Sequence, residues 1–278
     1  MKKICLLLLT LMFATVTFAQ KREKIKGSKN VTVAKKELQV FDNLEVEDNI
    51  EVYLLKGAAQ GLEIETDDNL QDIVKADLNG TTLRLYTTKG ISGAKKIAVH
   101  ITYTPGLKTI TVKHEAVLYA LTDLELETVT IKNFDFSRSM LNVKSANFSL
   151  IMNDKSKAEV NLKTENTTIE MSKNAELKAL IASPLVKLDM YQKTVAVIEG
   201  DAASVQLRVD NMAEFTGKKF TVKAMDLTAE SYTKCALMVS ETLNMSASGK
   251  AQVDLYGAPA IITMKKFADS AVISKKEL

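Results

Sequence analysis

The feature that most constrains the fold of this chain is an apolar pair that returns at a nearly constant interval. Each pair flanks a single residue, and this period-two alternation is typical of a strand with one buried face. The pairs are Leu150/Met152, Ile169/Met171, Leu188/Met190, Leu207/Val209, Met225/Leu227, Leu243/Met245 and Ile262/Met264. They recur roughly every 19 residues, and a fixed period near 20 predicts a solenoid.

Most repeats contain a second alternating segment, so each unit has the order strand, polar turn, strand, turn. These second pairs are Val160/Leu162, Leu177/Ala179, Val195/Val197, Ala213/Phe215, Leu237/Val239 and Val253/Leu255. Leucine-rich repeats have a similar period, but they need an Asn or Cys at a fixed place and a helical or looser return, which are missing here. We therefore expect an all-β fold: a right-handed parallel β-helix with coils of about 19 residues that stack about 4.8 Å apart, the apolar pairs pointing inward.

The residue between the two members of each first pair should point outward and form a column along the stack. That column reads Glu170, Asp189, Arg208, Asp226, Asn244 and Thr263. Arg208 lies between two carboxylates and can pair with either, and exposed ion pairs of this kind stabilise a fold by about 0.2–1 kcal/mol. Glu170, Asp189, Arg208 and Asp226 are the candidate functional ladder, although setting the register of the coils is the simpler interpretation.

The N-terminal third is less regular than the rest. We assign residues 20–35 to a polar tail and residues 36–278 to a single β-helix domain, with an irregular β part at 36–105 and regular coils at 106–278. Asn79-Gly80 predicts a tight hairpin turn. Because an open first coil invites edge-to-edge association, we expect the irregular part to start the stack and to cover that coil.

The segment 1–19 has the character of a bacterial secretory signal peptide. Lys2 and Lys3 precede an uncharged apolar run, and small residues surround Ala19, so cleavage is expected between Ala19 and Gln20. The run is short for a membrane span and no stop-transfer pattern follows it. We therefore expect export to the periplasm, the outer-membrane surface or the extracellular space, and no membrane-spanning segment.

Composition excludes some partners and cross-links. Removing residues 1–19 takes away two lysines, which leaves 37 − 2 = 35 basic against 34 acidic residues. Nucleic acid is not expected as a partner, because a nearly neutral chain binds a phosphate backbone poorly. Cys235 is the one cysteine after cleavage, so no intramolecular disulfide can form, and we expect Cys235 to be a small packed residue.

No motif in the sequence predicts a cofactor or a metal. The segment 248–251, SGKA, lacks the first glycine of a phosphate loop and precedes a strand, so it is interpreted as a turn. The acidic segment 67–72 lacks the glycine and the bidentate glutamate of a calcium loop and is interpreted as a solvated loop. His100 and His114 stand on different elements and do not form a zinc site.

Several segments together resemble a known family. They are GSKNVTVAKKELQVFDNLEVEDNIEVYLLKG, LNGTTLRLYT, IAVHITYTPGLKTITVKHEAVLYA and VDLYGAP, and in this order they are similar to the auto-transporter adhesin family that carries the head GIN domain, over residues 36–257. The resemblance implies a β-helix-like domain in exported bacterial proteins of the envelope or surface, with no catalytic residues to carry over. The turns SKNAE, QKTVA and SGKAQ depart from the Ser-Gly-Ala-Ser that the family often has.

These observations lead to three hypotheses for the function. The first is an exported, non-enzymatic β-solenoid of the bacterial envelope or surface, an adhesin-like binding or structural module whose partner is a glycan or a surface protein. The second is a β-helix carbohydrate-active enzyme, a polysaccharide lyase or hydrolase, for which Glu170, Asp189 and Arg208 are the ladder that comes nearest to a site. The third is a periplasmic accessory protein that holds a partner by strand addition at an open end of the solenoid.

Overall fold

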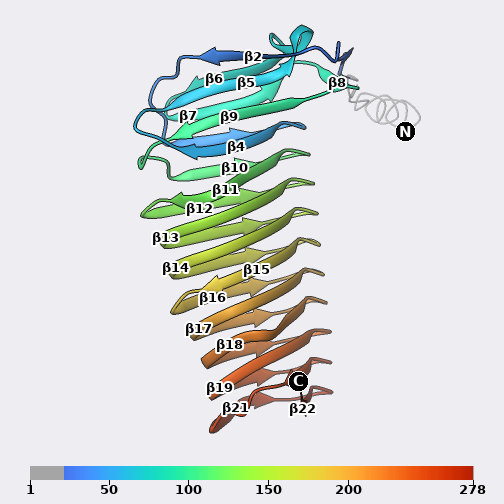
Figure 1. Cartoon of the computed structure of the whole chain (residues 1–278). Coiled ribbons are helices and arrows are strands. Elements are labelled where there is room, and N and C mark those ends of the chain that lie inside the picture. The colour runs from blue at the N-terminus through green and yellow to red at the C-terminus, as the bar shows by residue number, and fades with distance from the viewer. Residues whose placement is uncertain (1–21, 278) are drawn as a thin grey trace, which may run out of the picture.

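The computed structural model describes residues 22–277 as an elongated stack of coils (Figure 1). The fold is a β-solenoid of about nine turns with coils of roughly 19 residues, which confirms the fold class expected from the repeat. The predicted signal peptide, residues 1–19, lies outside the described residues. Within residues 22–277 no helix has the length and apolar character needed to cross a lipid bilayer.

The regular coils are built from parallel strands that stack in register. β13 and β14 pair from Arg138/Lys157 to Met152/Met171 with the same offset in sequence number throughout. In five coils one long bent strand supplies both halves, and in three others two shorter strands do so. The strands are β10 (Thr109–Val112), β11 (Val117–Glu125), β12 (Thr128–Asn133), β13 (Arg138–Met152), β14 (Lys157–Met171), β15 (Glu176–Ala182), β16 (Leu185–Met190), β17 (Val195–Val209), β18 (Glu214–Ala229), β19 (Lys234–Ala247), β20 (Gln252–Leu255), β21 (Ile261–Phe267) and β22 (Val272–Lys275).

The N-terminal part begins the stack and closes it with antiparallel strands (Figure 1). β3 and β4 join the parallel coils, while β2 pairs antiparallel with β5, β5 with β9, and β6 with β7 across the expected Asn79-Gly80 hairpin. The elements are β1 (Lys24–Lys26), β2 (Val31–Lys36), β3 (Asn43–Val46), β4 (Glu51–Lys56), β5 (Gly61–Asp67), η2 (Asp68–Leu70), β6 (Val74–Asn79), β7 (Thr82–Thr87), β8 (Gly90–Ser92) and β9 (Ile97–Tyr103). β1 and β2 therefore lie in the segment that the sequence analysis assigns to a polar tail.

A buried carboxylate fastens this N-terminal segment to the cap. Asp67 is fully buried, and its carboxylate accepts hydrogen bonds from the backbone N–H of Lys29 at 2.6 Å and of Lys95 at 3.0 Å. Gly27 packs so closely that a Cβ at this residue would lie 2.3 Å from Oδ2 of Asp67. The interpretation of residues 67–72 as a solvated loop is therefore wrong for Asp67, because its carboxylate oxygens accept hydrogen bonds from backbone N–H groups and not from water.

The inward positions agree with the repeat in most coils. The first-strand pairs are buried from Leu150 through Met245. Val195 and Val197 depart from the prediction: they face solvent with exposed fractions of 39% and 37%, and Ala196 and Ile198 are buried instead. The run VAVI is apolar in both phases of the alternation, so the sequence pattern alone could not select the buried face.

One coil is longer than the repeat suggests. Val197 pairs with Thr216, but the register shifts just after it, so that β18 carries one extra residue and Leu207 pairs with Leu227. Leu227 then pairs with Met245 across a shorter coil, and the two departures compensate each other. The order of the apolar pairs predicts that Leu207 aligns with Met225, but in the structure it aligns with Leu227.

The last described coil differs from those above it. β21 and β22 pair with β19 and β20, respectively, and Met264 occupies the inward column below Met245. Half of the Met264 side chain is nevertheless exposed, because within the described residues no further coil covers it. Its predicted burial in the core is therefore only partial.

Candidate functional site

The predicted outward ladder is only partly assembled. Glu170 on β14, Asp189 on β16 and Arg208 on β17 are direct neighbours in register. Asp226 on β18 lies opposite Gln206, so the longer coil places it one column away from Arg208. The structure thus brings three of the four candidate residues together.

The charges of this ladder pair with residues outside it. Asp189 lies 3.4 Å from the ammonium of Lys187, and Arg208 lies 3.6 Å from Glu230. The guanidinium of Arg208 also lies 5.0 Å from the ring centroid of Tyr191. These are separate surface contacts, each of small energy, and they do not direct two carboxylates and a cation toward one point.

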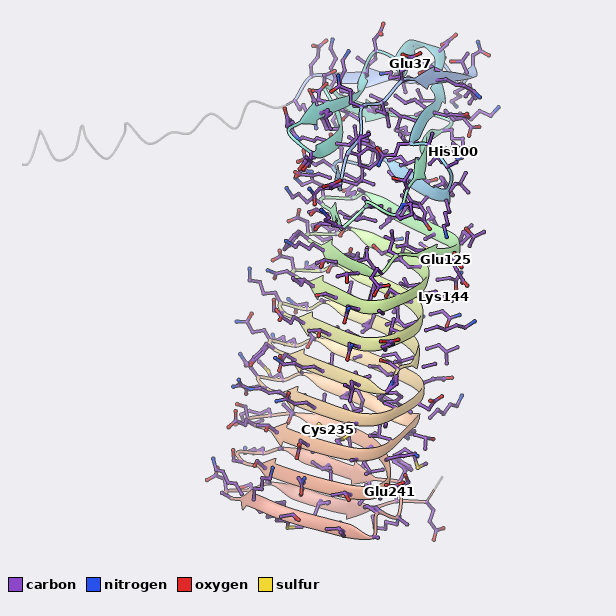
Figure 2. All side chains as sticks on the ribbon, turned by 90° about the vertical axis from the view of Figure 1, so that its left-hand side faces the viewer. Glu37, His100, Glu125, Lys144, Cys235 and Glu241 are labelled. Carbon is purple, nitrogen blue, oxygen red and sulfur yellow. The ribbon has the colours of Figure 1, made fainter. Side chains whose placement is uncertain are left out.

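An aromatic stack joins the cap to the first coils. The ring of Tyr53 on β4 stacks on Tyr119 of β11, with ring centroids 4.7 Å apart, and on His100 of β9, with ring centroids 5.2 Å apart. His100 lies in the upper part of the molecule in Figure 2. Burial, together with the hydrogen bond from the Tyr53 hydroxyl to Glu51, raises the pKa of Tyr53 to about 12. Because the rings cover the faces of one another, this cluster serves the packing of the cap rather than a ligand.

Cys235 lies inside the stack (Figure 2). Burial raises the pKa of its thiol to about 12, so the nucleophilic thiolate is suppressed at neutral pH. The prediction of a small packed cysteine is confirmed.

The turns that follow the first apolar pair of each repeat stack into a corner with an unusual backbone. In most of these turns one or two residues have positive φ, a region in which Asn and Asp are tolerated better than longer side chains. Across three successive turns both central residues adopt it, with φ from 51° to 67°, and they are Lys173, Asn174, Gln192, Lys193, Asn211 and Met212. The segment SGKA supplies the same corner further along through Gly249, with φ of 71°.

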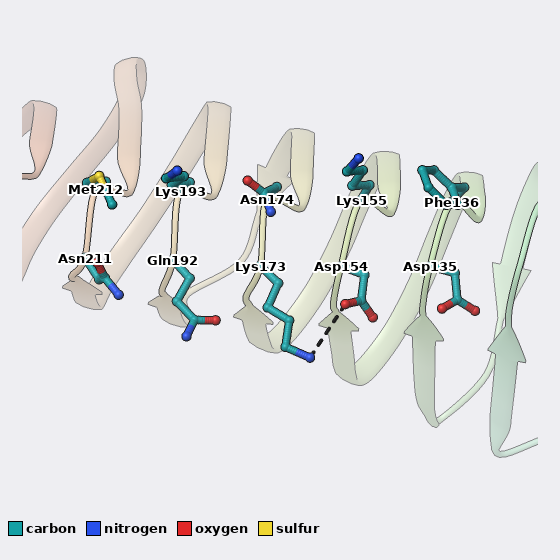
Figure 3. Close-up of a pocket in the computed structure, with 10 residues that line it drawn as sticks. All are labelled: Asp135, Phe136, Asp154, Lys155, Lys173, Asn174, Gln192, Lys193, Asn211 and Met212. Atoms are coloured by element: carbon teal, nitrogen blue, oxygen red, sulfur yellow. Dashed lines mark ion pairs between the residues drawn. The ribbon is translucent and has the colours of Figure 1, made fainter. Parts of the chain in front are cut away.

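Five successive turns of this corner enclose a groove of about 590 Å³, here called the corner groove (Figure 3). The first row of the groove consists of Asp135, Asp154, Lys173, Gln192 and Asn211. The second row consists of Phe136, Lys155, Asn174, Lys193 and Met212. The two rows run side by side along the stack, so the groove follows the axis of the solenoid.

Few of the polar groups in the corner groove are used within the protein. Asp135 accepts a hydrogen bond from the backbone N–H of His114 at 3.0 Å, and Asp154 lies 3.6 Å from the ammonium of Lys173. Lys155 lies 5.4 Å from the ring centroid of Phe136. Among the described residues, the side chains of the other polar members of the two rows have no hydrogen-bond or ion-pair partner; they are Asn174, Gln192, Lys193 and Asn211.

The corner groove was not predicted from the sequence. SKNAE and QKTVA lie in polar turns, as predicted, but single turns do not reveal which of their residues are equivalent in successive coils. Aligning the turns by the repeat gives the two rows, and the exposed Phe136 and Met212 in polar turns are the signal that was available. Within residues 22–277, no group of three or more His, Cys, Asp or Glu is placed to hold a metal ion.

Solved structures from two Parabacteroides species have the same fold. The crystal structure of a putative adhesin from Parabacteroides merdae ATCC 43184 is 14% identical, with a TM-score of 0.65 over 92% of this chain and 100% of that chain. A putative lipid binding protein from Parabacteroides distasonis ATCC 8503 gives the same identity, TM-score and coverage. At this identity the likeness establishes the fold alone. A comparison with curated proteins finds no match.

A family match extends over most of the chain. The family described as "Putative auto-transporter adhesin, head GIN domain" matches residues 40–259, which include the capping strands from β3 on, all five turns of the corner groove and β20. The resemblance seen in the sequence segments is therefore confirmed, and the chain belongs to the head GIN domain family of auto-transporter adhesins.

Proposed function

We propose that this chain is an exported, non-enzymatic binding module of the bacterial envelope or surface, with an adhesin-like role. The observation that carries the proposal is the corner groove, which lies along the axis of an elongated stack and presents polar side chains that have no partner within residues 22–277. Family membership and the name of the Parabacteroides merdae structure, a putative adhesin, support the same role. A groove that follows the axis suits an extended partner, a glycan strand or a segment of a surface protein.

Binding is tested with the full chain, purified after export. The protein is applied to arrays of bacterial envelope polysaccharides and host surface glycoproteins, beside an unrelated protein of similar size and net charge. We expect specific retention on at least one class of spot. Equal retention of the two proteins on every spot would contradict an adhesin-like role.

Export is part of the proposal and rests on the sequence of residues 1–19. The chain is produced in a bacterium with an intact secretion machinery, and the envelope and medium fractions are collected. We expect the exported form to begin at Gln20 when its N-terminus is sequenced. Retention of the intact N-terminus in the cytoplasmic fraction would refute the signal peptide.

The absence of catalysis is the second part of the proposal. A carbohydrate-active β-helix needs carboxylates and a cation directed at one sugar bond, whereas Asp189 and Arg208 pair with residues outside the ladder. If any polysaccharide cleavage is detected, the variants Asp189→Asn and Arg208→Gln decide its source. Loss of cleavage in both variants would establish the enzyme and end the proposal.

A second candidate function is a periplasmic accessory protein that holds a partner strand at the end formed by β21 and β22. The observation that favours it is the half-exposed Met264, whose strand pairs on one side within the described residues. A peptide with alternating apolar residues should bind the full chain and lose affinity on Met264→Lys, whereas the matched outward variant Thr263→Lys should bind normally. Identical binding by the two variants would exclude this end as the docking edge.

A further inference from the structure

The corner groove has the shape of a site for a chain-like ligand. Its lining comes from five successive coils, from Asp135 to Met212. At about 4.8 Å between coils, four intervals give a length of about 19 Å along the axis. A compact small molecule fills one point of such a groove, whereas a linear polymer can contact every turn.

The chemistry of the groove is that of hydrogen-bond recognition. The side-chain amides of Asn174, Gln192 and Asn211 can each donate and accept, and none has a partner among the described residues. Hydroxyl groups also donate and accept, so amides are suited to bind them. Three amides on consecutive turns therefore present the same recognition group once per coil.

The groove carries a small excess of positive charge, because three lysines stand against two aspartates among its lining residues. The carboxylate of Asp154 is next to Lys173, whereas Asp135 accepts one backbone N–H and keeps its negative charge at the Phe136 end. Lys155 and Lys193 have no carboxylate partner among the described residues. A ligand lying along the second row thus meets two ammonium groups separated by Asn174, and it gains from carrying negative charges of its own.

The apolar residues lie at the two ends of the groove and not along it. Phe136 is 57% exposed and Met212 is 45% exposed, and they are separated by four coil intervals. A lipid surface needs contiguous apolar side chains to insert, which this spacing does not provide. The C–H face of a sugar ring matches a single exposed aromatic ring, so Phe136 is suited to hold one end of a glycan.

We propose that the corner groove binds a linear, negatively charged polysaccharide along the solenoid axis. The amides of the last three turns bind hydroxyl groups, Lys155 and Lys193 bind the carboxylate or sulfate groups, and Phe136 contacts a sugar ring at the other end. This inference rests on the proposed binding function and specifies its ligand class.

The test measures binding of the full chain to labelled polysaccharides at low ionic strength. The probes are polygalacturonate, which carries carboxylates, dextran sulfate, which carries sulfates, and neutral dextran. The variant Lys155→Gln/Lys193→Gln removes both charges and keeps side-chain length, and the neighbouring Gln192 already adopts the same positive φ as Lys193. The matched control is Lys163→Gln/Lys223→Gln. These two lysines are exposed and lie outside the corner groove, and neither has an ion-pair partner among the described residues.

We expect at least one charged probe to bind, the neutral probe to bind much more weakly, and the groove variant to lose about tenfold in affinity for the charged probe. The control pair should change it by less than about twofold. Phe136→Ser should weaken binding severalfold with no change in salt dependence. If the double variant melts at a lower temperature than the parent, Lys155→Gln alone, outside the positive-φ positions, replaces it.

Several results would overturn the inference. The first is an equal loss of affinity in the groove and control variants, and the same holds if neither charged probe binds. The second is equally tight binding of poly-L-glutamate, which would mean recognition of charge without sugar. The third is binding to phosphatidylglycerol vesicles that Phe136→Ser abolishes while polysaccharide binding is absent. If the array shows specific retention that the groove variant keeps, the inference fails and the proposed function stands; if the array shows none, the proposed function fails as well.

Discussion

The buried carboxylate of Asp67 makes a strong prediction about the stability of the cap. Asp67 accepts backbone hydrogen bonds from Lys29 at 2.6 Å and from Lys95 at 3.0 Å while fully shielded from water. A hydrogen bond to a charged group contributes about 1.5–3 kcal/mol. Asp67→Ala removes these two bonds and the longer one from the backbone N–H of Lys96 at 3.4 Å, and the desolvation cost of the carboxylate that disappears with it offsets part of the loss. We expect a net loss of about 3 kcal/mol.

The loss should be local to the N-terminal end, because the coils of a solenoid interact chiefly with their nearest neighbours. Native-state hydrogen exchange read by mass spectrometry is therefore the assay, with urea unfolding followed alongside it. Peptides that cover β2 and β8 should exchange about 100-fold faster in Asp67→Ala, as about 3 kcal/mol requires, while β17 and β18 stay protected.

Asp67→Asn retains one carbonyl oxygen as an acceptor but turns an N–H toward backbone donors, so its loss should lie between that of the alanine variant and zero. The matched control is Asp72→Ala, since Asp72 is an exposed carboxylate of the same segment. An effect of Asp67→Ala no larger than that of Asp72→Ala would refute the reasoning, because a carboxylate that holds two chain segments cannot be equivalent to a solvated one.

Three further predictions concern packing and ionisation. Gly200→Ala should lower the free energy of unfolding by about 2 kcal/mol or more, because φ of Gly200 is 110° and a Cβ would lie 2.0 Å from a backbone oxygen of the neighbouring coil. The control is Gly80→Ala, whose Cβ meets no atom within 4 Å. Equal melting temperatures of the two variants would contradict this prediction. Ultraviolet titration should show that Tyr53 ionises with a pKa of about 12, and Glu51→Gln should lower this pKa. Because the folded pKa lies above the unfolded value of 10.0, the stability that this group contributes is complete below about pH 10 and is lost as the pH rises through 12. Cys235 should react with a thiol reagent only after unfolding, and rapid reaction in the native protein would exclude its burial.

The repeat was a reliable guide to the fold but not to the placement of the ladder. Glu170, Asp189 and Arg208 align as the spacing of the repeat predicts. Asp226 does not, because a register shift after Val197 makes one coil longer and the next one shorter. An alternating pattern is unchanged when it slides by one full period, so no inspection of apolar pairs could detect the displacement.

The corner groove was missed for a related reason. Turn residues carry no apolar periodicity, so the apolar pattern does not align Asn174, Lys193 and Met212, and only their spacing along the repeat does. Their shared positive φ and the stacking of one turn on the next place them in two rows. Asp67 is a similar case, because its burial depends on Lys29 and Lys95, which are distant from it in the sequence.

The sequence by itself therefore determined the architecture: an alternation that repeats about every 19 residues can bury its apolar faces only by stacking parallel coils. The tertiary structure decided everything that depends on which residues of different coils meet, including the true ladder neighbours, the antiparallel pairing of β2, β5 and β9 in the cap, and the corner groove. The physical reason is that alternation is a local property of one strand, whereas register, turn stacking and backbone contacts to a buried carboxylate form only between segments that folding brings together.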